Sequence, residues 1–251
     1  MSDVRVFADA ETLSRAAARE FIALCRQAVD ARGRFTVALA GGSTPRRVYE
    51  LLADHEHCDQ VDWTRVEFFW GDERAVPPEH PDSNYGMAAA ALLGKLDLRP
   101  EQVHRIQAER PDRESAARDY EVEIAGVFGV SPEGPLPPFD LILLGMGRDG
   151  HTASLFPCAE AVHERRRQVV RNYVVKLQAE RITLTFPMIN RARDIRVVVA
   201  GAEKAPALKD VLEGPHDPER LPSQLLSPVA GRLGWLVDRA AANALTPERG
   251  T

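Results

Sequence analysis

The chain has 251 residues, of which 44% are hydrophobic and 27% are charged, a composition typical of an ordinary globular protein. Its formal net charge of −5 argues against a nucleic-acid partner, although a local field in a cleft can still attract a small anion. No apolar segment approaches the roughly 18 residues of a membrane-spanning helix, and the charged N-terminus lacks the apolar stretch of a signal peptide.

Segments with helical and strand patterns alternate along the chain. Apolar residues at helical spacing over 11–32 predict a helix that ends at Gly33. The run RFTVALA at 34–40 predicts a buried strand, and the run at 65–70 predicts a second one. Further along, the pattern predicts helices at 81–94, 113–128 and 203–212, and strands at 140–145, 181–186, 195–201 and 231–238.

The segment GGSTP at 41–45 predicts a tight turn that leads into a helix. Pro45 suits the first helical turn, and Ser43 or Thr44 suits the cap. Glycines and hydroxyls at a helix N-terminus favour an anion, for which phosphate is the usual guest. An ordinary capped turn explains the same residues equally well. The segment is not a Walker A loop, because the G-K-[ST] ending is missing.

Nearly continuous apolar strands that alternate with helices predict an α/β fold with a mostly parallel sheet covered on both faces. No internal repeat or linker divides the chain, so we expect one domain over 1–251. In such sheets the ligand crevice lies beyond the carboxyl ends of the strands. Four predicted strands end in polar, glycine-rich segments, which are AGGST (40–44), WGDER (70–74), GMGRDGHT (145–152) and AGAEK (200–204).

Charged side chains occur in or near these strand-end segments. Asp72, Glu73 and Arg74 pair carboxylates with a guanidinium, which suits a sugar hydroxyl and an oxyanion. Taken alone, these residues are better explained as a solvated charge cluster. Arg181 and Lys204 are either surface cations or phosphate contacts. Because Lys204 is predicted in the first turn of a helix, where a cation is unfavourable, it weakly indicates an anionic ligand.

The run GMGRDG at 145–150 spells G-x-G-x-x-G after a strand, which is the dinucleotide-binding fingerprint. That motif also requires an acidic residue about 20 positions later. The chain there is VVRNYVVKL (169–177), without a carboxylate. We therefore expect no dinucleotide, and we interpret the glycines as giving the loop freedom to hold Asp149 and His151.

His151 is the best candidate for proton transfer. A histidine has a reference pKa of about 6.5 and accepts a proton at neutral pH. Asp149, two residues earlier, is placed to orient the ring. A lone histidine is more often structural, but one in a glycine-rich loop at a strand end is better placed for chemistry than most.

The sequence predicts no metal site. The run HEHC at 55–58 has no partner cluster, so we interpret it as a solvated loop. Cys25, Cys58 and Cys158 are far apart and form no C-x-x-C pair, which argues against a disulfide framework. Reduced thiols are the simplest interpretation, and they indicate a cytoplasmic location.

Taken together, five stretches resemble the 6-phosphogluconolactonase family and span most of the chain in order. The patterns WGDERxVPPxxxxSNY and GMGxDGHTASLFP are highly specific in combination. The five stretches are ALAGGSTPRRVYELL (38–52), WGDERAVPPEHPDSNYGMA (70–88), LILLGMGRDGHTASLFP (141–157), RITLTFPMIN (181–190) and GAEKAPAL (201–208).

The resemblance implies a Rossmann-like fold, similar to glucosamine-6-phosphate deaminase and ribose-5-phosphate isomerase, without a metal or cofactor. It implies hydrolysis of a sugar-phosphate lactone, with no nucleic-acid, membrane or obligate protein partner. His151 is expected to act as general base with help from Asp149, with Arg74 or loop N–H groups stabilising the oxyanion and Asp72 orienting hydroxyls. The expected substrate and phosphate contacts are Gly41, Gly42, Ser43, Thr44, Asn84, Arg181 and Lys204.

Two alternatives differ in function. Deaminase relatives share the Asp-Gly-His turn, but they carry a catalytic glutamate five residues after the histidine, where this chain has Phe156. A non-catalytic sugar-phosphate sensor usually carries a DNA-binding domain, and none is expected ahead of this one. The sequence therefore favours the lactonase.

Overall fold

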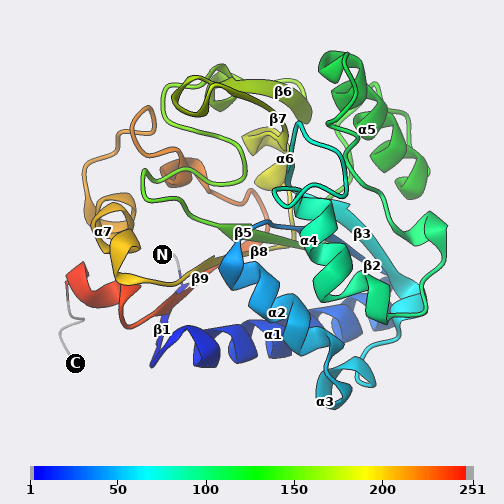
Figure 1. Cartoon of the computed structure of the whole chain (residues 1–251), viewed down its shortest axis with the longest axis horizontal. Helices are drawn as coiled ribbons and strands as arrows, with labels where there is room; N and C mark the ends of the chain where they lie inside the picture. Colours follow the sequence, from blue (N-terminus) through cyan, green and yellow to red (C-terminus); the bar gives the residue numbers. More distant parts are fainter. Residues whose placement is uncertain (1–2, 247–251) are drawn as a thin grey trace.

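Six parallel strands form the central sheet of the structure, a computed structural model that describes residues 3–246. Their order is β1–β9–β8–β5–β2–β3, and every neighbouring pair is parallel (Figure 1). The predicted parallel sheet is thereby confirmed. The strands are β1 (Asp3–Phe7), β2 (Phe35–Leu39), β3 (Val66–Trp70), β5 (Leu141–Gly145), β8 (Asp194–Val199) and β9 (Arg232–Asp238).

A second, three-stranded antiparallel sheet lies beside the first, in the order β4–β7–β6. Its strands are β4 (Asp72–Arg74), β6 (Val169–Val174) and β7 (Ala179–Leu184). The strand expected at 181–186 belongs to this sheet and begins two residues earlier. Because β6 alternates buried and exposed residues and β4 has three residues, neither resembles the buried strands that we expected, and neither was predicted.

The helices flank both sheets. In Figure 1, α1 and α2 lie side by side along the lower part of the view, and α5 lies in the upper part next to β6. No helix within residues 3–246 has the length and hydropathy needed to cross a bilayer. The helices are α1 (Ala10–Arg32), α2 (Ser43–Ala53), α3 (His55–Cys58), α4 (Asn84–Ala91), α5 (Arg113–Phe128), α6 (Phe186–Ile189) and α7 (Ala205–Glu213).

The ends of the helices follow local chemistry, with one correction. The helix α1 ends at Gly33, as predicted; the Asp9 side chain caps its start, and Gly33 lies in the left-handed region. Ser83 caps α4. The predicted cap of α2 was wrong, because its N-cap residue is Gly42 at φ 102°, and no side chain accepts from the first turn. Ser43 is instead the first helical residue, so the first-turn N–H groups of α2 are not capped by a side chain.

Two predicted helices are shorter than expected. The helix expected at 81–94 is α4, which ends at Ala91 and passes into a 3₁₀ turn at Leu93–Lys95. The helix expected at 203–212 begins as a 3₁₀ turn at Ala202–Lys204, and the α-helix follows from Ala205. Lys204 is therefore the N-cap residue of α7.

A partly buried ion-pair cluster around His104 ties β3 to α5. His104 stacks on Phe69, with ring centroids 4.5 Å apart. Its Nδ1 lies 2.9 Å from Glu123 Oε1, and its Nε2 lies 3.1 Å from Glu67 Oε2. Burial lowers the pKa of His104, but the two carboxylates outweigh this effect and raise the pKa to about 9.

We therefore expect the free energy of unfolding to fall as pH rises. The folded-state pKa of His104 is about 9, above its ordinary value of 6.5, so the stabilisation is complete below pH 6.5 and lost through pH 9. The expected loss is about 2–3 kcal/mol. Urea unfolding of the wild type and of His104→Gln at pH 6 and pH 9.5 measures it. Equal pH dependence in both proteins would contradict this assignment.

Candidate active site

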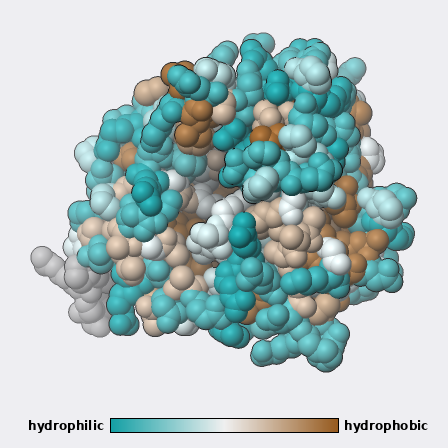
Figure 2. All heavy atoms as spheres, viewed as in Figure 1, coloured by the Kyte–Doolittle hydropathy of each residue, from teal (hydrophilic) through white to brown (hydrophobic). Residues whose placement is uncertain are grey.

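The carboxyl ends of β2, β3, β5 and β8 meet at one cleft, which confirms the expected convergence of the strand-end segments. A cavity of about 190 Å³ lies there, and an adjoining space of about 370 Å³ shares part of its lining. Figure 2 shows a hollow near the middle of this face. Both spaces are lined by Asp72, Arg74, Gly147, His151, Ala153 and Lys204.

His151 and Asp149 form a hydrogen-bonded pair in this cleft. His151 Nδ1 lies 2.5 Å from Asp149 Oδ1, and the His151 side chain is 26% exposed. An ionised carboxylate only accepts hydrogen bonds, so Nδ1 is the donor and Nε2 keeps its lone pair. The imidazole therefore has the tautomer that a general base requires.

Asp149 is held in its ionised form. Its second oxygen, Oδ2, lies 2.9 Å from Lys176 Nζ. Burial raises the pKa of Asp149, but hydrogen bonds and charges from His151 and Lys176 outweigh it and hold the pKa well below its usual range. A carboxylate beside the imidazole stabilises the imidazolium that forms when the ring takes a proton.

Phe156 fixes the plane of the imidazole. Its ring stacks on His151 with centroids 3.9 Å apart and an interplanar angle of 22°. Phe156 thus stands at the position where the deaminase relatives carry a glutamate. An aromatic ring there supplies packing and no proton, so the imidazole has one carboxylate neighbour in its own loop, Asp149.

The glycines of the loop make room for this pair. A Cβ at Gly147 would lie 2.0 Å from His151 Nδ1 and 2.8 Å from Asp149 Oδ1. Gly150 has φ +73°, in the left-handed region that favours glycine. The positive φ of Gly150 agrees with the predicted backbone freedom of this loop, and the close approach of the imidazole to Gly147 is a further constraint that was not predicted.

Replacing Gly147 by alanine is expected to lower kcat about tenfold, because the new methyl group displaces the imidazole, and misplacement by about 1 Å costs up to 10²-fold. The partly exposed ring has space to move, so the melting temperature is expected to change little. Steady-state kinetics and thermal unfolding test this, with Gly126→Ala as control, where a Cβ meets nothing within 4 Å. Unchanged kcat would contradict it.

Asp72 and Asn84 hold β4, the start of α4 and the loop of Ser154 together through hydrogen bonds. Asp72 Oδ2 accepts from Ser154 Oγ at 2.6 Å, and Asn84 Nδ2 donates to the Asp72 carbonyl at 2.8 Å. Asn84 is buried, and its Oδ1 lies 1.7 Å from where a Cβ of Gly41 would be. Asp72 borders the cleft, whereas Asn84 packs behind the glycine loop and is not part of the cleft lining.

Five cations border the cleft, and three of them are the ones that the sequence predicted as site residues. Arg74 and Arg181 are opposite each other in the β4–β7 register, and Lys204 borders the same space. Burial lowers the pKa of Arg181, and the charge of Arg74 lowers it further. Burial also lowers the pKa of Lys204. Like charges gathered in a half-buried cleft favour an anionic ligand.

Glu73 has a structural role that sequence reasoning missed. Its side chain is buried and accepts from the backbone N–H groups of Asn84 and Tyr85, each at 2.8 Å. Burial raises the pKa of Glu73, and these N–H groups partly offset the effect. A carboxylate at the start of α4 suits the helix dipole. The only sequence signal for it was the charge cluster WGDER.

The start of α2 lies at the cleft. Gly41 and Gly42 line the smaller cavity, whereas Ser43 and Thr44 form the first turn of the helix behind it. Uncapped first-turn N–H groups and the positive end of the helix dipole suit a phosphate. Within residues 3–246, no group of three or more His, Cys, Asp or Glu side chains is arranged to hold a metal ion.

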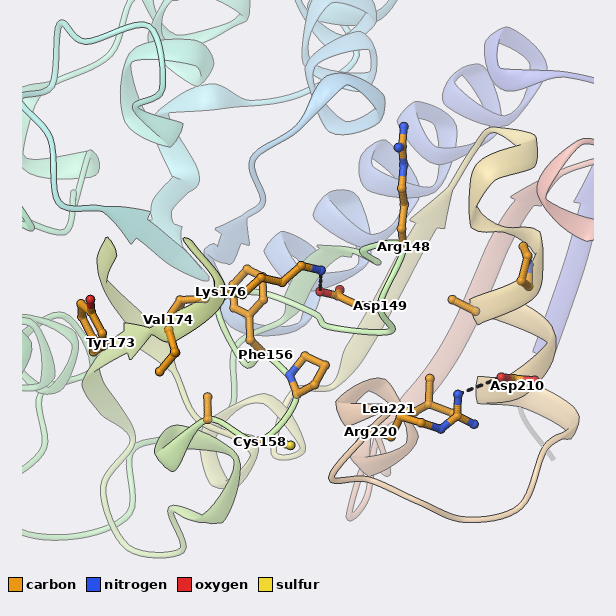
Figure 3. Close-up of a pocket in the computed structure, with 15 residues that line it drawn as sticks. Arg148, Asp149, Phe156, Cys158, Tyr173, Val174, Lys176, Asp210, Arg220 and Leu221 are labelled. Atoms are coloured by element: carbon orange, nitrogen blue, oxygen red, sulfur yellow. Dashed lines mark hydrogen bonds and ion pairs between the residues drawn. The ribbon is translucent and has the colours of Figure 1, made fainter. Parts of the chain in front are cut away.

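A larger cavity of about 680 Å³ adjoins the cleft. Figure 3 shows it, with Lys176 reaching across to Asp149. Sequence reasoning missed Lys176, because the segment 169–177 was searched for a carboxylate and carries no motif. The cavity shares Arg148, Asp149, Phe156 and Lys176 with the cleft.

Comparison with known proteins gives relatives over most of the chain. The family model for glucosamine-6-phosphate isomerases/6-phosphogluconolactonase matches residues 8–235. A 6-phosphogluconolactonase of Nostoc sp. is 42% identical over 219 residues, which cover 87% of this chain and 88% of the relative. One from Synechocystis sp. is 42% identical over 221 residues, covering 88% and 89%.

Solved structures give the same result. The 6-phosphogluconolactonase from Trypanosoma cruzi superimposes with a TM-score of 0.85 at 29% identity, covering 98% of each chain. A monomeric glucosamine-6-phosphate deaminase has a TM-score of 0.80 at 23% identity, covering 96% of this chain and 99% of the other. The latter likeness concerns the fold alone, and it confirms the predicted fold class.

Proposed function

The chain belongs to the glucosamine-6-phosphate isomerase/6-phosphogluconolactonase family, and from this premise we propose that it hydrolyses 6-phospho-D-glucono-1,5-lactone to 6-phospho-D-gluconate. The reaction is a step of the oxidative pentose phosphate pathway. The observation that carries the proposal is the His151–Asp149 pair, which borders a cleft rich in cations. We propose that residues 3–246 form one such domain; the two ends of the expected range 1–251 lie outside the described residues.

The phosphate of the substrate is proposed to bind at the start of α2 and to Arg181 and Lys204. A phosphate carries about −1.5 to −2 charges at neutral pH, so it offsets the repulsion between the cations. The first-turn N–H groups of α2, from Ser43 onward, are suited to its oxygens. Because Gly42, Lys204 and His151 line the same cavity, the lactone ring is proposed to lie next to His151.

The proposed chemistry is general-base hydrolysis. Nε2 of His151 takes a proton from water as the water oxygen bonds to C1 of the lactone, and the carbonyl oxygen becomes an oxyanion. When the tetrahedral intermediate collapses, the bond between C1 and the ring oxygen breaks. The imidazolium returns its proton to that ring oxygen, and Asp149 stabilises the charged ring in between. The products are an open-chain acid and a regenerated imidazole.

The remaining site residues are proposed to position these groups. Arg74 or loop N–H groups stabilise the oxyanion. Asp72 orients substrate hydroxyls and holds Ser154 of the His151 loop. Asn84 is buried against Gly41, so it is proposed to support the turn at Gly41 and Gly42 and not to contact the ligand.

Neither alternative function is favoured. Aldose–ketose chemistry in the deaminases uses a glutamate where this chain has Phe156, which stacks on His151. A non-catalytic sensor requires no polarised imidazole, whereas His151 is paired with an ionised carboxylate. The curated relatives of Nostoc sp. and Synechocystis sp. are both named as lactonases.

We also propose a cytoplasmic location, because Cys25, Cys58 and Cys158 are unpaired thiols. The ligand is a small sugar-phosphate lactone. That the protein acts without a cofactor, a nucleic acid, a membrane or an obligate protein partner stays a prediction.

The deciding experiment generates 6-phosphogluconolactone in situ and follows its decay with and without protein. We expect the protein to accelerate acid formation well above spontaneous hydrolysis. A parallel assay with glucosamine 6-phosphate is expected to release no ammonia. Ammonia release without lactone hydrolysis would reverse the assignment in favour of the deaminase, and binding without either reaction would favour a sensor.

A further inference from the structure

Lys176 contacts the catalytic pair from the second sheet. It lies in the 3₁₀ turn Val175–Leu177, at the tip of the hairpin that joins β6 to β7. Its Nζ is 2.9 Å from Asp149 Oδ2, while Asp149 Oδ1 bonds the imidazole of His151. The two oxygens of one carboxylate are thus divided between the base and this lysine.

The side chain of Lys176 also forms part of the wall between two spaces. Lys176, Asp149 and Phe156 line both the cleft and the larger cavity of about 680 Å³. In Figure 3, Lys176 passes beside Phe156 and ends at Asp149. The Asp149 side chain is 21% exposed, whereas that of Lys176 is 68% exposed, so the lysine reaches in from solvent.

This ion pair contributes little to folding but constrains Asp149. A lysine–carboxylate pair with one well-exposed partner adds little to the stability of a protein, because solvent screens the attraction. Asp149, however, lies in a loop in which Gly147 and Gly150 leave the backbone few side-chain constraints. A carboxylate held at both oxygens has one rotational setting, and that setting keeps Oδ1 on Nδ1 of His151.

We infer that Lys176 is a positioning residue of the reaction, because it anchors Asp149 so that the imidazole of His151 stays aligned with Nε2 available to water. The inference rests on the proposed function. The catalytic pair comes from the loop after β5, and its anchor comes from the β6–β7 hairpin. Alignment of the base therefore depends on how the two sheets are held together.

Charge gives this role a measurable signature. Asp149 places a negative charge beside the imidazole of His151, and Lys176 neutralises part of that charge from the other carboxylate oxygen. Removing the charge of Lys176 leaves Asp149 less neutralised, so the imidazolium is stabilised and the imidazole titrates at higher pH. The cations that border the cleft are Arg74, Arg148, Lys176, Arg181 and Lys204.

The test compares Lys176→Met with the wild type across pH. The acid limb of kcat/KM, which reports the base in the free enzyme, is expected to move to higher pH in Lys176→Met. The plateau kcat is expected to fall about threefold to tenfold, and Lys176→Arg is expected to restore both. Arg171→Met is the matched control, because Arg171 pairs with Glu180 at 3.2 Å across the same hairpin.

NMR titration of the His151 imidazole separates the two proposals, because it needs no turnover. A midpoint shifted upward in Lys176→Met supports the charge coupling of Lys176 to the catalytic pair even if the wild type shows no lactone hydrolysis, a result that would contradict only the proposed function, while a lower plateau kcat restored by Lys176→Arg supports the positioning role. An unmoved acid limb and an unmoved imidazole midpoint would overturn the role of Lys176. An equal shift in Arg171→Met would overturn it as well.

Discussion

Replacing His151 by glutamine is expected to lower kcat for lactone hydrolysis by about 10²–10⁴-fold, the usual contribution of a positioned general base. Glutamine fills a similar volume and still offers a group to Asp149, but it has no lone pair that takes a proton at neutral pH. The KM is expected to change little, because the proposed phosphate contacts lie on other elements.

The measurement compares initial rates after subtraction of spontaneous hydrolysis, which sets the floor for every variant. His216→Gln is the control, since His216 is exposed and lies outside the cleft lining. Activity close to that of the wild type in His151→Gln would remove the imidazole from the mechanism. Equal losses in both variants would point to a defect unrelated to proton transfer.

Replacing Lys204 by methionine is expected to lower kcat/KM for the phosphorylated lactone by up to about 100-fold, chiefly through KM. A hydrogen bond to a charged group contributes about 1.5–3 kcal/mol, and each 1.4 kcal/mol is a factor of ten. Methionine keeps the length and the apolar stem of lysine, so the half-buried position stays filled.

Hydrolysis of the unphosphorylated lactone by the same two proteins tests whether the effect of Lys204 depends on the phosphate. Glucono-1,5-lactone lacks the group that Lys204 is proposed to bind, so its slow hydrolysis is expected to be the same in wild type and variant. Lys209→Met serves as control, because Lys209 lies on α7 and pairs with Glu213 at 2.8 Å. Equal effects on both lactones would show that Lys204 does not act through the phosphate.

Elements with strong periodicity were predictable from sequence. The helices α1 and α5 match their predicted ranges within one residue, because Gly33 and Gly129 end them in the left-handed region. All five residues of β2 are buried, so an uninterrupted apolar run marks that strand. Periodicity, glycine at helix ends and apolar runs therefore suffice to predict an element whose own residues show the pattern.

Two strands of the second sheet, β4 and β6, were not predictable in the same way, whereas β7 was expected at 181–186. The three residues of β4 are charged, and they form a strand because β7 pairs with them from more than 100 residues later in the chain. Strand partners that are distant in sequence leave no local pattern.

The N-cap of α2 was misassigned for a local reason, because Gly42 takes a conformation that leaves Ser43 inside the helix.

In the candidate site, too, residues that belong to one local motif were predicted, whereas residues placed by long-range packing were not. Asp149 and His151 were found because their spacing in one loop is visible in sequence, and their contact is observed. Lys176 comes from a hairpin 25 residues after His151, and only the packing of two sheets brings it to Asp149. Asn84 was expected at the ligand, yet it is buried behind Gly41.

The close approach of Asn84 to Gly41 ties two distant positions of the chain to one another. A side chain at 41 would require the amide at 84 to retract, and that amide also holds Asp72, which in turn holds Ser154 in the loop of the base. Directed evolution towards bulkier lactones therefore has to vary these positions jointly in one library. A substitution at Gly41 alone would shift Asn84, Asp72 and Ser154, and so disturb the loop that holds His151 without widening the substrate range.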